Sequence, residues 1–132
     1  MTAELTVLAL AALWQAVQIA VAGVAQNRDT GVDWNLGPRD RAPDLSPLTG
    51  RLRRAVSNHF ESLIFFTIAV VVVTQSGAAS AITTMAAWLY LVARLLYLPA
   101  YAYGWKPWRS VIWAVGFGAT LLMLGAALLS SV

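Results

Sequence analysis

The sequence contains no cysteine and only one histidine, His59. The lack of cysteine excludes disulfides, thiolate nucleophiles and cysteine metal sites. A single histidine excludes a metal site built from several histidines. Charged residues are also scarce, at 11% of the chain, whereas hydrophobic residues make up 59%. Because this balance is far from that of a soluble globular domain, we expect an integral membrane protein without a metal site.

Four apolar stretches are long enough to cross a membrane, since a spanning helix needs about 20 mostly apolar residues. They cover about 5–25, 55–75, 79–103 and 110–129. The first stretch carries Glu4 and no basic residue, and it is longer than a typical signal-peptide core. We therefore expect a retained helix there rather than a cleaved signal peptide. The sequence predicts one all-α domain, 1–132, folded as an integral membrane four-helix bundle.

The basic residues are concentrated in two of the three connections between these stretches. Most of them follow the first stretch, and Lys106 and Arg109 follow the third. The turn between the second and third stretches and both chain ends carry no Lys or Arg. By the positive-inside rule, both basic connections lie in the cytoplasm and both termini lie on the non-cytoplasmic side. A basic membrane face also explains the pI of about 9.8 without a nucleic-acid partner.

The connection over 26–50 is the only long loop in the sequence. Glycines and prolines, such as Gly31, Gly37 and Pro43, predict that it forms no regular element. A loop of this length in so small a protein is usually functional or disordered. The polar run also carries Trp34, a residue type enriched at the headgroup layer. The second helix is expected to begin near Pro47 or Leu48, before the apolar stretch.

Two charged residues, Glu61 and Arg94, interrupt stretches that are otherwise apolar. A charge at the centre of a spanning helix costs roughly 2.5–3.5 kcal/mol on insertion scales, so it usually marks a partner or a site. Helical spacing places further polar residues beside each of them. Arg54, Asn58 and Glu61 share one helix face, and Arg94, Tyr97 and Tyr101 share another.

The depths of the two charges also match. At about 1.5 Å per residue, Glu61 lies roughly 10 Å beyond Arg54, and Arg94 lies roughly 14 Å before Tyr103. We therefore expect Glu61 and Arg94 to meet, within one subunit or across an oligomer interface. A purely structural alternative is that the pair only joins two helices and that the tyrosines belong to an interfacial belt. His59 points off this face and is expected to be structural or interfacial.

Basic residues outnumber acids around the expected site. A single intramembrane acid, Glu61, faces an excess of positive charge. Such an excess favours an anionic ligand. The basic residues that converge there are Arg51, Arg53, Arg54, Arg94, Lys106 and Arg109.

The same residues carry a resemblance to a known family. The run from Arg51 to Glu61 contains Arg-Ala-x-x-Asn-x-x-Glu, and this pattern resembles the signature of the MAPEG family, the membrane-associated proteins in eicosanoid and glutathione metabolism. Arg94 followed seven residues later by Tyr101 resembles the family's second motif, and the turn from Pro107 to Ser110 resembles its last helix junction. Two motifs in register make the match specific, and it spans nearly the whole chain.

The resemblance implies a homotrimer with sites between subunits near the cytoplasmic side of the membrane, here a bacterial inner membrane. It implies glutathione as the bound thiol, with arginines holding its carboxylates and Glu61 its amino group. Arg109 and Ser110 would stabilise the thiolate that attacks a hydrophobic electrophile arriving from the lipid. The implied activity is a glutathione-dependent transferase or peroxidase. The implied glutathione pocket consists of Arg54, Asn58, Glu61, Arg94, Tyr97 and Tyr101.

Two other functions stay open from the sequence. Eicosanoid-forming members carry a further Arg where this chain has Ser57. That difference favours a non-enzymatic member of the same fold that binds lipid or acts as a scaffold. A small transporter or channel is a third reading, although four helices with one buried ion pair offer no evident pathway.

Overall fold

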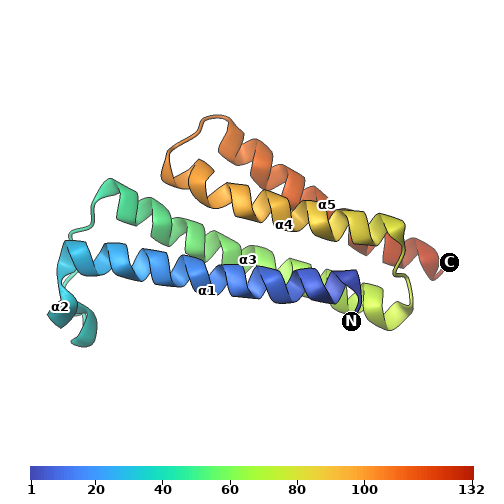
Figure 1. Ribbon diagram of the computed structural model, residues 1–132, viewed down its shortest axis with the longest axis horizontal. Coiled ribbons are helices and arrows are strands. Elements are labelled where there is room, and N and C mark those ends of the chain that lie inside the picture. The colour runs from blue at the N-terminus through green and yellow to red at the C-terminus, as the bar shows by residue number, and fades with distance from the viewer.

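The computed structural model describes all residues, 1–132, and every regular element in it is a helix (Figure 1). The elements are α1 (Ala3–Thr30), α2 (Val32–Leu36), α3 (Pro47–Ser76), α4 (Ala81–Ala102) and α5 (Trp108–Ser130). Four of them, α1, α3, α4 and α5, are long and apolar enough to cross a membrane. The prediction of an all-α protein with four membrane-spanning helices is therefore confirmed.

The connection after the first span is shorter and more ordered than expected. α1 continues to Thr30, and α2 occupies five residues of the segment that was expected to have no regular element. That expectation is wrong because Gly31, at φ 83°, separates two helices rather than ending helical structure. α3 begins at Pro47, where the Ser46 side chain accepts a hydrogen bond from the Thr49 amide and proline occupies the first turn.

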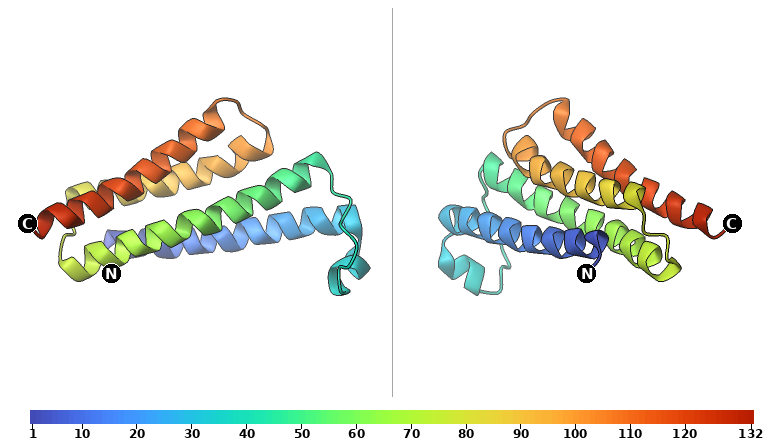
Figure 2. Two further views of the ribbon diagram at one scale, coloured as in Figure 1. Left: turned by 180° about the vertical axis from the view of Figure 1, so that it is seen from behind. Right: turned by 45° about the vertical axis from the view of Figure 1, so that its right-hand side comes forward.

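The helices are arranged so that both chain termini lie at one end of the bundle (Figures 1 and 2). The opposite end carries α2, the start of α3 and the connection between α4 and α5. We call it the basic end, because every Lys and Arg except Arg94 lies in or beside these elements. α1 packs beside α3 and α4 beside α5, and α3 also contacts α4 and α5. α4 also contacts α1, so α3 and α4 each contact the three other long helices.

The turn between α3 and α4 is held by local hydrogen bonds. Gly77 ends α3 in the left-handed conformation, at φ 68°. Ser80 and Thr83 form a reciprocal capping box at the start of α4. This tight turn fixes α3 and α4 as antiparallel neighbours.

The core is built from small side chains and a few aromatic ones. Alanines such as Ala69, Ala87 and Ala119 are buried and allow the helices to approach closely. Phe66 of α3 stacks on Tyr90 of α4, with ring centroids 3.8 Å apart. Large apolar side chains instead cover the outside of every long helix. An apolar exterior of this extent suits a lipid environment.

Candidate functional site

A cavity of about 430 Å³ opens at the basic end between the start of α3 and the α4–α5 connection. Four of its lining side chains are cationic and none is acidic. We call it the basic cavity. Its volume lies within the range of small-molecule sites. The lining consists of Arg51, Arg54, Tyr101, Gly104, Trp105, Lys106, Pro107, Arg109 and Ser110.

Two tyrosines connect this cavity to the interior of the bundle. Tyr101 accepts a hydrogen bond from Arg54 Nε at 3.0 Å, and the Arg109 guanidinium lies 4.9 Å from the centre of its ring. Tyr97 is buried and meets Tyr101 edge to face, with centroids 5.7 Å apart. The Arg94 guanidinium lies 4.4 Å from the Tyr97 ring centre. Cation–π contact therefore links three arginines through two rings.

A smaller cavity of about 80 Å³ lies deeper, between α3, α4 and α5. We call it the inner cavity. Asn58, Glu61 and Arg94 line it together with Ser62, Phe65, Trp113, Phe117 and Thr120. The Asn58 Oδ1 atom is buried and has no hydrogen-bond partner. Because buried polar atoms are normally paired, this carbonyl and the Glu61 carboxylate form an acceptor site open to a ligand donor.

Glu61 and Arg94 line the same cavity but form no ion pair with each other within the chain. The expectation that they meet is therefore not fulfilled in one chain. Arg94 is almost fully buried and donates from Nε to His59 Nδ1 at 3.1 Å. Glu61 is exposed on the bundle surface. Its carboxylate is left free for another group.

Helical spacing did not indicate the contact between His59 and Arg94. The ring of His59 is fully buried, and Nε2 lies 2.9 Å from the carbonyl oxygen of Ala11 in α1. A carbonyl only accepts and a guanidinium only donates, so His59 is neutral and carries its proton on Nε2. It therefore links α1 to Arg94. The prediction of a structural role holds in that sense, although His59 also sets the position of a site residue.

Positive potential is concentrated at the position of Arg109 and Ser110. Both stand in the first turn of α5, where the helix dipole is positive. Arg109 adds a full charge there, and both residues line the basic cavity. A thiol held beside them would have a lowered pKa, because cations and helix N-termini stabilise the thiolate.

The structure places seven of the eight predicted site residues in the lining of these two cavities. Arg54, Tyr101, Arg109 and Ser110 line the basic cavity. Asn58, Glu61 and Arg94 line the inner cavity. Tyr97 stands between the two groups through its contacts with Arg94 and Tyr101. Ser57, which has the helical spacing of this face, instead lines cavities on other sides of α3.

The fold and these cavities define an integral membrane helical bundle with a cationic site at one end. The family model of the MAPEG family matches residues 1–129, so the chain belongs to the MAPEG family. This confirms the resemblance found in the motifs around Glu61 and Arg94. The family includes glutathione transferases and peroxidases. A comparison with curated proteins gives no match.

Proposed function

We propose that this chain is a membrane-bound, glutathione-dependent transferase or peroxidase that acts on hydrophobic electrophiles. The observation that carries the proposal is the division of charge between the two cavities. All charged side chains of the basic cavity are cationic, whereas the inner cavity combines Arg94 with two acceptors free for a ligand, Asn58 Oδ1 and the Glu61 carboxylate. Glutathione has two carboxylates and one ammonium group, and this division complements it.

In this proposal each predicted residue has a chemical role. Arg54 and Arg94 hold carboxylates, while Asn58 and Glu61 accept hydrogen bonds from the ammonium group. Tyr97 and Tyr101 form the wall between these groups. Arg109 and the first turn of α5 stabilise the thiolate, and the Ser110 hydroxyl donates to its sulfur. The proposed chemistry uses these side chains and the thiol alone.

The transfer reaction follows from the thiolate. Its sulfur forms a bond to an electrophilic carbon, and the leaving group departs with the bonding electron pair. With a lipid hydroperoxide, the thiolate attacks the terminal peroxide oxygen and the alkoxide leaves and takes up a proton. The resulting sulfenic acid condenses with a second glutathione to give the disulfide and water. The apolar outer surface of the helices would allow such substrates to arrive through the lipid.

The proposal also includes the assembly and the orientation. We propose a homotrimer in which the exposed Glu61 face lies at a subunit contact, as the family resemblance implies. We propose that the basic end faces the cytoplasm, here of a bacterial inner membrane, because the arginine-rich connections lie there.

Binding of glutathione to the purified protein in detergent tests the proposal by isothermal titration calorimetry. We expect saturable binding at millimolar glutathione or below, and turnover of chlorodinitrobenzene or a lipid hydroperoxide. Absence of binding with the assembly intact would reject the proposal.

A second candidate function is a non-enzymatic lipid-binding or scaffolding role. The observation that favours it is an open apolar groove of about 880 Å³ along α5 near the end with the termini. Leu121, Leu122 and Leu129 line this groove beside Gly118 and Gly125. Co-purifying lipid without turnover of any electrophile would favour this role over the enzymatic one.

A further inference from the structure

α1 holds Arg94 of α4 at two points, one of them through His59 of α3. Arg94 Nε donates to His59 Nδ1 at 3.1 Å, and His59 Nε2 donates to the Ala11 carbonyl oxygen of α1 at 2.9 Å. The indole Nε1 of Trp14, about one turn further along α1, donates to the Arg94 carbonyl oxygen at 3.2 Å. α1 therefore fixes both the side chain and the backbone of a residue that lines the inner cavity.

The contacts of the Arg94 guanidinium leave one edge of this group free. Its Nε–H is directed to His59, and the ring centre of Tyr97 lies 4.4 Å from its central carbon. Neither terminal nitrogen has a hydrogen-bond partner within the chain. Because a guanidinium is planar and carries five N–H donors, the four donors of the terminal nitrogens remain for a ligand. They suit a carboxylate that binds end-on through both nitrogens.

His59 can accept from Arg94 in only one of its forms. The Ala11 carbonyl only accepts, so Nε2 carries the proton, and Nδ1 then has a lone pair for the Arg94 Nε–H. In the other tautomer, or in the imidazolium, an N–H at Nδ1 would face the N–H of Arg94. The contact with α1 thus determines the tautomer that the contact with Arg94 requires.

Arg94 has no carboxylate partner within the chain. Glu61 lines the same cavity but forms no ion pair with it. Between Ser62 and Ala93 the sequence contains no Asp, Glu, Lys, Arg or His. A carboxylate partner would neutralise the guanidinium, whereas the neutral imidazole fixes its position and leaves its charge uncompensated. Because Arg94 is only 3% exposed, this charge is poorly solvated and favours an anionic ligand.

A second hydrogen bond between α1 and α3 makes no contact with Arg94. Gln15 Nε2 donates to the Val56 carbonyl oxygen at 3.0 Å, and Gln15 is buried. This bond lies about one helical turn from the contact between His59 and Ala11. α1 and α3 are thus joined independently of His59, so joining these helices does not by itself account for the imidazole.

We propose that His59 is a positioning residue for glutathione binding. Its neutral ring holds the Arg94 guanidinium without neutralising it, so that both terminal nitrogens face a carboxylate of glutathione. The Ala11 carbonyl of α1 contributes to the site by fixing the tautomer of His59. This inference rests on the proposed function and assigns no direct contact between His59 and the substrate.

Nitrogen NMR of the wild type in detergent, with isotope-labelled histidine, tests the tautomer. His59 is the only histidine, so its two ring nitrogens give the only labelled signals. We expect a protonated Nε2 and an unprotonated Nδ1 at neutral pH, both without and with glutathione. In Arg94→Met, which lacks the donor, the Nδ1 signal should move to the position of a free lone pair. A proton on Nδ1 of the wild type would overturn the proposal.

Calorimetry with glutathione tests the consequence for binding. His59→Ala should raise the Kd of glutathione by about tenfold, because Arg94 is no longer held toward the carboxylate. His59→Asn keeps an acceptor for Arg94, and its Kd should return to within about threefold of the wild-type value. Gln15→Leu is the matched control, since it removes a buried hydrogen bond between the same helices without touching Arg94. It should bind glutathione as the wild type does.

This inference and the proposed function can fail separately. Absence of glutathione binding by the wild type would reject the proposed function and this inference with it. If the wild type binds, an equal Kd for His59→Ala would overturn the positioning role alone. An equal loss of affinity in Gln15→Leu would also overturn that role, because the loss would then follow helix packing rather than the position of Arg94.

Discussion

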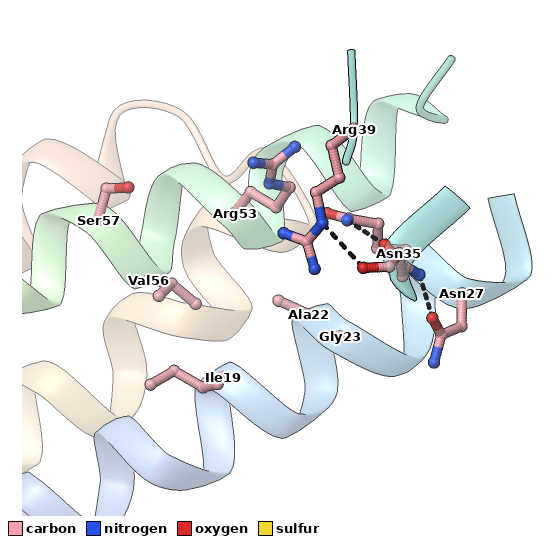
Figure 3. Close-up of a pocket in the computed structure, with 10 residues that line it drawn as sticks. Ile19, Ala22, Gly23, Asn27, Asn35, Arg39, Arg53, Val56 and Ser57 are labelled. Atoms are coloured by element: carbon pink, nitrogen blue, oxygen red, sulfur yellow. Dashed lines mark hydrogen bonds between the residues drawn. The ribbon is translucent and has the colours of Figure 1, made fainter. Parts of the chain in front are cut away.

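The basic end of the protein has cationic cavities on different sides of α3, and the two sides differ in their acceptors. On the side of α4 and α5, arginines are combined with the Glu61 carboxylate and the unpaired Asn58 carbonyl oxygen. On the side of α1 and α2, a cavity has arginines combined only with amides, a hydroxyl and apolar groups (Figure 3). The first set complements a ligand with charges of both signs, as proposed for glutathione, whereas the second set contains no acidic side chain. The two sides therefore differ in their acceptors and not in the presence of arginines.

Arg109→Ala is expected to cause the largest loss on the α4–α5 side. Removing the cation beside the thiolate should lower kcat for chlorodinitrobenzene by about a hundredfold, as removal of one oxyanion-stabilising donor does. Steady-state kinetics at saturating glutathione measures this effect. Arg41→Ala, on the other side of the basic end, is the control and should keep full activity. Equal rates for both variants would remove Arg109 from the chemistry.

His59→Ala tests how far α1 supports the inner cavity. The change leaves Arg94 and the Ala11 carbonyl without their partner, and the unfolding free energy should fall by about 1–3 kcal/mol. Denaturation in mixed micelles, followed by circular dichroism, measures the change. His59→Asn, which keeps an acceptor on a shorter side chain, is the comparison variant and should recover part of the loss. Unchanged stability of His59→Ala would show that Arg94 does not depend on this contact.

Glu61→Gln tests the acceptor half of the inner cavity. Loss of the charge should raise the Kd of glutathione by about tenfold, because a charge-assisted hydrogen bond to the ammonium group is weakened. Calorimetry in detergent provides the measurement. N-acetylglutathione, which lacks the ammonium group, is the matched ligand and should bind the wild type and Glu61→Gln equally. A uniform loss with both ligands would contradict the proposed contact.

Tyr101→Phe should have a smaller effect, because only the hydrogen bond to Arg54 is lost while the ring remains. We expect KM for glutathione to rise by about fivefold and kcat to stay constant. Tyr103→Phe is the control, since Tyr103 is exposed and does not line the basic cavity. A fall in kcat with constant KM would mean that Tyr101 acts in the chemistry instead.

Arg39→Gln should leave turnover with glutathione unchanged, which is the smallest effect in this series. Arg39 lines the cavity between α1, α2 and α3 and does not line the basic cavity that contains Arg109. The same kinetic assay as for Arg109→Ala measures it. A loss comparable to that of Arg109→Ala would mean that the two sides of α3 serve a single site.

The apolar spans and the membership of the family could be predicted from the sequence, because hydropathy and two short motifs carry that information. The start of α3 near Pro47, eight residues before its apolar stretch, was also predicted, and the Ser46 cap and the contact of Arg51 with Ala102 stabilise this polar first part. The end of α1 was predicted less well, because the helix continues to Thr30 beyond its apolar stretch. α2 escaped prediction because it is only five residues long and stands between two glycines.

The residues of the candidate site were predicted along each helix, but the contacts between residues of different helices were not. Helical spacing placed Glu61 and Arg94 at one depth, and both do line the inner cavity. The spacing could not show that α1 packs against α3 and buries His59 under Arg94. It also could not show the cavity between α1, α2 and α3, because Arg39 and Arg53 are brought together by the path of the segment after α2.

A structure of the assembled protein with glutathione bound tests the central claim most directly. The account predicts density between α3, α4 and α5, with carboxylates at Arg54 and Arg94, the ammonium group at Glu61 and the sulfur beside Arg109. A fully occupied assembly in which Glu61 contacts only lipid, or in which the sulfur lies away from Arg109, would contradict it.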